Sequence, residues 1–193
     1  MKVLVACEFS GRTRDAFIRR GHSCVSVDLL PGEGEFPHHH IQGDALQVMR
    51  HGKFDLMIAH PPCTYLCNSG VRWLYEKEGR WELMRQGAEF FKQFLDADIP
   101  HICVENPVMH KYAKEIVGQN FSQSIQPWEF GHGEIKRTCL WLKGLPHLKP
   151  TNVVPGRLAR MHLMAPSPDR GKLRSVTYDG FAEAFADQWS VLD

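Results

Sequence analysis

The stretch KVLVACEFSGRTRDAFIRR, residues 2–20, opens the chain with a strand and a helix in direct succession. Residues 2–7, which are apolar from Val3 onward, predict a buried strand, and residues 13–20 predict a helix that ends at Gly21. This alternation continues up to residue 105, with strands predicted at 23–28, 54–59 and 101–104 and helices at 44–50 and 81–97. Strands that alternate with helices imply right-handed crossovers and a mostly parallel sheet, so we predict a Rossmann-like, doubly wound α/β fold.

The pattern is weaker in the second half of the chain. Residues 121–126 and 138–143 predict later strands, and residues 180–189 predict a closing helix. Residues 144–168 are rich in proline and basic residues and predict loops. No second domain is evident, so we expect residues 1–193 to form a single domain with a short, loop-rich C-terminal part.

The composition is that of an ordinary globular protein, with 43% hydrophobic and 23% charged residues among 193. These values exclude a disordered chain, a fibrous protein and a disulfide-rich miniprotein. The sequence has no apolar run of the roughly 20 residues that cross a membrane and no signal-peptide core, so we expect a cytoplasmic protein without a membrane partner. The net charge of +1 does not by itself indicate a nucleic-acid partner, and the six cysteines are expected to be thiols.

Two motifs place reactive side chains just after predicted strands, at the edge where such sheets bind ligands. In FDLMIAHPPC, residues 54–63, two prolines stiffen the exit of the strand, and Cys63 then follows as an exposed and rigidly held nucleophile. A buried structural cysteine is the alternative. In ICVENP, residues 102–107, Glu105 could protonate or hydrogen-bond a substrate nitrogen, or Glu105 and Asn106 could cap a loop.

Three further features of this edge indicate a nucleotide-like cofactor. Gly11 lies between the first strand and the first helix, where it would let a cofactor approach the N-terminus of the helix. Asp28 ends the second strand, where an acid can hold ribose hydroxyls, although it could also cap a turn. Asp44 lies on the same edge and could also be a helix N-cap.

Taken in order, these motifs resemble those of the C5-cytosine DNA methyltransferases, which use S-adenosylmethionine. The similar stretches are FSG at 9–11, Asp28, Asp44, PPC at 61–63, EN at 105–106, and FG at 130–131 followed by Lys136 and LW at 140–141. The resemblance covers about residues 1–143 and is closest to the short, stand-alone proteins of this family that phages and prophages encode. It implies a methyltransferase-type fold. It also implies that the protein acts in the cytoplasm of a bacterial host cell.

The resemblance also implies a reaction, the transfer of a methyl group from S-adenosylmethionine to C5 of cytosine in duplex or single-stranded DNA. The thiolate of Cys63 would attack C6, Glu105 would hydrogen-bond N3 and the exocyclic amine, and Lys136 would help to hold the base or its phosphate. The residues implied to bind S-adenosylmethionine are Phe9, Ser10, Gly11, Asp28, Asp44 and Pro61.

Several departures from the family pattern leave other functions open. Thr13 replaces a glycine of the cofactor loop, Thr64 replaces the glutamine after the catalytic cysteine, and the large target-recognition region is missing. Residues 175–180 are the candidate for the last motif of the family. The same machinery could act on another pyrimidine substrate, such as RNA or a nucleotide. The chain could also be a non-catalytic nucleic-acid-binding or regulatory protein, and a homodimer or a recognition partner would replace the missing region.

Two segments are candidates for contact with nucleic acid. Residues 64–80 are expected to form a mobile loop in which Arg72 and Trp73 combine a cation with a stacking surface, although Trp73 could instead pack on the sheet. The second is a basic strip, or else a solvated loop, made of Arg157, Arg160, Arg170, Lys172 and Arg174. A metal site would need more ligands than HPPCTYLC, residues 60–67, supplies, so we predict no metal.

Overall fold

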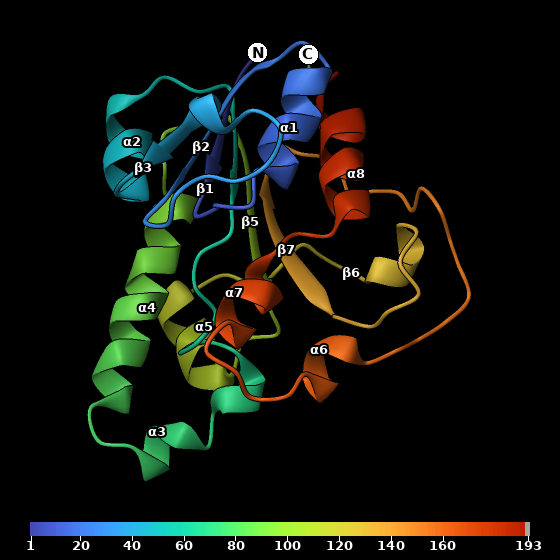
Figure 1. Cartoon of the computed structure of the whole chain (residues 1–193). Coiled ribbons are helices and arrows are strands. Elements are labelled where there is room, and N and C mark those ends of the chain that lie inside the picture. The colour runs from blue at the N-terminus through green and yellow to red at the C-terminus, as the bar shows by residue number, and fades with distance from the viewer. Residues whose placement is uncertain (192–193) are drawn as a thin grey trace.

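The computed structural model describes residues 1–191, in which seven strands form one sheet with helices on both faces (Figure 1). The strand order is β3-β2-β1-β4-β5-β7-β6. The strands are β1 (Lys2–Ala6), β2 (Ser23–Asp28), β3 (His40–Gln42), β4 (Leu56–Ala59), β5 (His101–Pro107), β6 (Gln123–Ile125) and β7 (Thr138–Lys143). Strands β1 to β5 are parallel to one another, whereas β7 runs antiparallel to both β5 and β6. The predicted α/β fold with a mostly parallel sheet is therefore confirmed.

Helices cover both faces of this sheet. They are α1 (Arg12–Arg19), α2 (Ala45–His51), α3 (Trp73–Glu76), α4 (Arg80–Leu95), α5 (Lys111–Val117), α6 (Arg160–Leu163), α7 (Arg170–Ser175) and α8 (Asp179–Trp189). Helices α1 and α8 pack on one face, and α2, α4 and α5 pack on the other (Figure 1). Because both faces are covered, the β4 side chains are all buried and the strand is a continuous apolar run. Within residues 1–191, no helix combines the length and the apolar character that crossing a membrane requires.

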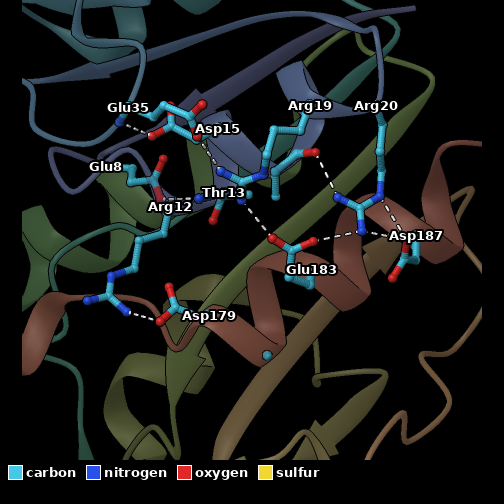
Figure 2. A network of polar contacts seen from close by, with 12 residues as sticks. Glu8, Arg12, Thr13, Asp15, Arg19, Arg20, Glu35, Asp179, Glu183 and Asp187 are labelled. Atoms are coloured by element: carbon cyan, nitrogen blue, oxygen red, sulfur yellow. Dashed lines mark hydrogen bonds and ion pairs between the residues drawn. The ribbon is translucent and has the colours of Figure 1, made fainter.

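Ion pairs join α1 and its C-terminal cap to α8 (Figure 2). They are Arg12–Asp179 at 2.6 Å, Arg19–Glu183 at 2.7 Å, Arg20–Glu183 at 2.7 Å and Arg20–Asp187 at 2.5 Å. Each pair is partly exposed to solvent and contributes about 0–1 kcal/mol, so most of the attachment comes from the apolar contacts beneath. Phe181, Phe185 and Trp189 of α8 are buried in the same core as Phe17 of α1, which fixes the last helix beside the first.

The segments that follow β4 and β7 differ from the prediction. Residues 64–80, predicted as a loop, contain a 3-10 turn and helix α3, because Leu66 and Leu74 are buried in the core. Residues 144–168, also predicted as loops, contain helix α6. Strand β5 continues beyond its predicted end to Pro107, because β7 pairs with it along that whole stretch.

Candidate active site

His60 and Glu105 lie side by side at the carboxyl ends of β4 and β5. The parallel register pairs Ala59 with Val104, so the residues that follow them are neighbours on one face of the sheet. His60 Nδ1 lies 3.2 Å from Glu105 Oε2, and the two side chains are only 8% and 17% exposed. The motif around Glu105 indicates a role for it, whereas the sequence offers His60 only as a possible metal ligand, because the contact of His60 with Glu105 depends on the register of the two strands.

Asn106 holds the turn that carries the candidate nucleophile. Its side chain is buried, and Nδ2 donates a hydrogen bond to the carbonyl oxygen of Pro61 at 3.1 Å. Pro61 is buried as well, and Cys63, at the end of the Pro-Pro turn, is only half-buried. Asn106 therefore attaches the end of β5 to the Pro-Pro turn instead of capping a loop of its own, and Cys63 lies outside the core.

Cys63 and Cys67 form a pair of thiols one turn apart. The amide of Cys67 donates to the carbonyl oxygen of Cys63 at 3.0 Å. A hydrogen bond between the two thiols, together with burial and the charge of Glu105, raises the pKa of Cys63. The same hydrogen bond, with further ones from Ser69 and the Gly70 amide, lowers the pKa of Cys67. Of the two thiols, Cys67 is therefore the more acidic.

Lys136 approaches Glu105 from the segment that precedes β7. Both residues line one small cavity with His60, and Lys136 Nζ donates to the carbonyl oxygen of Arg174 at 3.1 Å. Burial alone would raise the pKa of Glu105, but the hydrogen bond from His60 and the charges of Lys136 and His60 outweigh it, so this pKa lies below its ordinary value. Glu105 is therefore ionised at neutral pH. The charges of Glu105 and Lys136 both affect the pKa of Cys63, so the three candidate catalytic residues lie near one another, although Cys63 does not line the cavity.

The cavity that Glu105 and Lys136 share is small. Its volume is about 10 Å³, which is room for one water molecule and far less than a pyrimidine base needs. Its lining residues are His60, Glu105, Lys136, Thr138, Ser175, Thr177, Tyr178, Phe181 and Phe185. Five of these residues lie at the end of α7, in the segment between α7 and α8, or in α8. This part of the chain must therefore move before a base can enter.

Helix α7 contacts both Lys136 of the candidate site, through the carbonyl oxygen of Arg174, and the predicted cofactor loop. Lys172 Nζ is 2.6 Å from Glu33 Oε1 and 5.1 Å from the ring centre of Phe9. The charge of Arg174, near the end of the same helix, contributes to the lowered pKa of Cys67. One short helix therefore contacts two regions for which the sequence predicts different ligands.

The N-terminus of α1 is occupied by groups of the chain itself. Glu8 is buried, and its carboxylate accepts hydrogen bonds from the amides of Thr13 at 2.8 Å and Arg14 at 3.3 Å. Gly11 has a φ of 73°, and a Cβ at this position would lie 2.2 Å from Arg14 Nη2 and 2.5 Å from the carbonyl oxygen of Glu33. Gly11 thus permits the close approach of Arg14 and Glu33, and cofactor binding at this turn stays a prediction.

Asp28 and Asp44 lie near each other, beside Cys7. Asp28 Oδ1 accepts the amide of Leu30 and Asp44 Oδ1 accepts the amide of Leu46, both at 2.9 Å, so each acid also caps the turn or helix that follows it. Burial and the charges of the two carboxylates raise the pKa of Cys7 to about 12. Among residues 1–191, no hydrogen bond engages the second oxygen of either carboxylate. Such acceptors suit ribose hydroxyls and an adenine amine, so these residues fit the nucleoside half of S-adenosylmethionine.

A polar cleft of about 420 Å³ opens beside the cofactor loop, between α1 and α8 (Figure 2). Its lining residues are Ser10, Arg12, Asp15, Arg19, Glu33, Gly34, Glu35, Val176, Asp179, Ala182 and Glu183. Arginine side chains suit a carboxylate, and the more numerous acids suit an ammonium group. The cleft joins Ser10, which is itself mostly buried together with Phe9, to residues 175–180, the candidate for the last family motif.

The predicted nucleic-acid residues do not form one free basic strip, because three of them already have partners. The contacts are Arg160–Glu134 at 2.8 Å, Lys172–Glu33 at 2.6 Å and the Arg157 guanidinium over the ring of Trp128 at 3.9 Å. Arg170 and Arg174 belong to α7. Trp73 is half-buried, and the guanidinium of Arg72 lies 4.2 Å from its ring centre.

No known family profile and no curated protein matches the chain. Solved structures with a similar fold include a DNA modification methyltransferase encoded within a prophage of E. coli, at 14% identity and a TM-score of 0.49, over 86% of this chain and 55% of that one. The Entamoeba histolytica methyltransferase EhMeth is 12% identical with a TM-score of 0.47, over 80% of this chain and 57% of that one. A mutant of Spodoptera frugiperda DNMT2 is 15% identical with a TM-score of 0.42, over 87% and 60%. This chain thus spans less than two thirds of each, and TM-scores below 0.5 carry no argument about function, which rests on the site itself.

Proposed function

We propose that this protein transfers a methyl group from S-adenosylmethionine to C5 of cytosine in DNA, through a covalent bond between Cys63 Sγ and C6 of the base. The observation that carries the proposal is the cluster of Cys63, Glu105 and Lys136 at the carboxyl ends of β4 and β5 and the start of β7. A nucleophile, an acid–base group and a cation in one cluster suit thiolate addition to an electron-poor ring.

Cytosine must be activated by the residues of the cluster, because C5 alone is too weak a nucleophile to accept a methyl group. Cys63 would first lose its proton to Cys67, whose thiolate accepts the hydrogen bond between them. The Cys63 thiolate would then add to C6, with Glu105 hydrogen-bonded to N3 and the exocyclic amine and with Lys136 at the base or its phosphate. Loss of the C5 proton to water would finally expel Cys63.

S-adenosylmethionine, when bound, supplies an electrophilic methyl group on a positively charged sulfur. The second oxygens of Asp28 and Asp44 would hold its ribose and adenine. The other residues of this site would be Phe9, Ser10, Gly11 and Pro61. The amino-acid end would enter the polar cleft, where Arg12 suits the carboxylate, since Glu8 already occupies the N-terminus of α1.

Entry of a base between Glu105 and Lys136 requires movement of the end of α7 and of the segment before α8, because the cavity there has the volume of one water molecule. The helix carries Arg170, Lys172 and Arg174, which would contact phosphates once it moves. In a duplex the base must also leave the stack at a cost of a few kcal/mol, which a single strand avoids. A second copy of the chain or a separate partner would supply target recognition, in the cytoplasm of a bacterial host cell.

The ionised state of Glu105 favours a second candidate, in which the same site acts on another pyrimidine in RNA, DNA or a nucleotide. A carboxylate accepts a hydrogen bond from the N3–H of a uracil ring without any proton transfer. Cytosine has no N3–H, so Glu105 must be protonated to serve it. The lowered pKa of Glu105 therefore makes the identity of the base the main question for experiment.

The test incubates the purified protein with isotope-labelled S-adenosylmethionine and with duplex DNA, single-stranded DNA, RNA, and cytidine and uridine nucleotides. Mass spectrometry of the digested products should find labelled 5-methylcytosine from DNA with the wild type and with Cys24→Ala, a control that removes a thiol outside the cluster. Cys63→Ala should yield none, and an active Cys63→Ala enzyme would refute the covalent mechanism. Labelled 5-methyluracil would select the second candidate, and cofactor binding without product would indicate a binding or regulatory protein.

A further inference from the structure

His60 belongs to the cluster, but the mechanism above gives it no part. Its side chain is 8% exposed, and Nδ1 lies 3.2 Å from Glu105 Oε2. Nε2 is buried without a hydrogen-bond partner among the described residues, and His60 lines the cavity that Glu105 and Lys136 share. A buried polar nitrogen without a partner is unfavourable, so its retention beside the reaction cavity requires an explanation.

The charged and titratable groups that line the cavity with His60 come from three directions. They are Glu105 on β5, Lys136 before β7 and Tyr178 before α8. The hydroxyl of Tyr178 donates to Glu134 at 2.6 Å, so it is engaged away from the imidazole. Glu105 is thus the group that shares a hydrogen bond with His60, and the two can hold one proton between Nδ1 and Oε2.

An ionised Glu105 lacks the proton that N3 of cytosine requires from it. The N3 lone pair repels a carboxylate, whereas a carboxylic acid donates a hydrogen bond to it. Thiolate addition at C6 then places negative charge on N3, and a proton must neutralise that charge. Glu105 needs a proton source within hydrogen-bond distance, and His60 Nδ1 is at that distance.

We propose that His60 is a positioning residue that holds the Glu105 carboxyl toward the base and supplies the proton with which Glu105 neutralises N3 of cytosine. The inference rests on the proposed function and adds a proton source to it. As the bond between Cys63 Sγ and C6 forms, the Nδ1 proton passes to the Glu105 carboxylate, and the resulting acid delivers a proton to N3. His60 is then neutral and Glu105 ionised again, and the reverse transfers occur when Cys63 leaves.

The test uses DNA that contains 5-fluorocytosine, because fluorine cannot leave C5 as a proton and the Cys63 adduct accumulates when S-adenosylmethionine is present. Mass spectrometry of the intact protein gives the rate of adduct formation from about pH 5 to about pH 9, a range that spans imidazole titration. His60→Asn keeps an amide that can donate to Glu105 but cannot release a proton. His101→Asn, which changes a histidine bonded to the Gly144 carbonyl at the far end of β5, is the matched control.

We expect His60→Asn to form the adduct about 100-fold more slowly than the wild type near neutral pH, a typical contribution of a proton-transfer group. The variant should recover as the pH falls, because solvent can then protonate Glu105, and His101→Asn should keep the wild-type profile. Thermal melting verifies that each variant is folded, and His60→Gln replaces His60→Asn if the latter is not.

Two results would overturn this inference alone, namely a wild-type rate in His60→Asn or an equal loss at every pH, which a merely structural role would produce. A wild type that forms no adduct at any pH would instead overturn the proposed function, and the role of His60 with it.

Discussion

The hydrogen bond from Asn106 to Pro61 can be removed by a single substitution, Asn106→Ala. The change deletes the Nδ2 donor, which lies 3.1 Å from the Pro61 carbonyl oxygen, and leaves this buried acceptor without that partner. Because the asparagine side chain is 1% exposed, water cannot readily take its place. Cys63 follows two residues after Pro61, so the change should affect the position of the nucleophile as well as stability.

The expected loss in the free energy of unfolding is about 2 kcal/mol, because a buried acceptor that loses its partner costs about 1–3 kcal/mol. Two smaller contributions have opposite signs. The cavity left by the deleted amide adds to the loss. Removal of Asn106 Oδ1, which has no hydrogen-bond partner within residues 1–191, relieves a desolvation cost.

Urea denaturation measures this stability, and adduct formation with 5-fluorocytosine DNA measures the reactivity of Cys63. Asn68→Ala removes an exposed amide from the neighbouring turn and should change the free energy of unfolding by less than about 0.5 kcal/mol. If Asn106→Ala also loses less than about 0.5 kcal/mol and keeps the wild-type adduct rate, the reasoning that this hydrogen bond holds the turn is refuted.

Near about pH 6, iodoacetamide should modify Cys67 before Cys63, because hydrogen bonds lower the pKa of Cys67 and keep it ionised where an ordinary thiol is protonated. Peptide mapping gives the order, and earlier labelling of Cys63 would contradict the proton distribution described here. Phe185→Ala should lower the free energy of unfolding by about 3–5 kcal/mol, because the ring is fully buried and stacks 5.0 Å from Trp189. Urea denaturation tests this, and a loss under about 1 kcal/mol would show that α8 is not part of the core. Arg174→Ala should weaken DNA binding and reduce the slope of log affinity against log salt by about 0.9, and an unchanged slope would exclude a phosphate contact.

Apolar runs with polar ends were sufficient to locate the central strands. Strands β2 at 23–28 and β7 at 138–143 have their predicted bounds, because each carries buried side chains between polar neighbours. Strand β3 gives no such signal, since it is a three-residue edge strand without a buried residue. Helix α7 could not be predicted from the sequence either, because none of its residues is buried and its position depends on contacts with distant loops.

The candidate nucleophile and acid could be found from sequence because short local motifs contain them. Cys63 follows two prolines, and Glu105 lies near the end of an apolar strand. The contacts that complete the site depend on tertiary structure. His60 meets Glu105 only through the register of β4 and β5, and Cys67 meets Cys63 only because the chain makes one turn there. The sequence shows the four-residue spacing of the two cysteines, but it does not show whether the residues between them form a turn or a loop.

Helix α7 is six residues long, yet it is in contact with the surroundings of both predicted ligands. It reaches Phe9 through Lys172, and it reaches Lys136 of the candidate site through the carbonyl oxygen of Arg174. So short a helix cannot move away from one region and leave its contacts with the other unchanged. Binding at the two sites should therefore be coupled, and a base that displaces α7 would raise the affinity for the cofactor. Linkage then requires the cofactor to raise the affinity for the base by the same factor, so the two substrates would bind with positive cooperativity although they never share a contact residue.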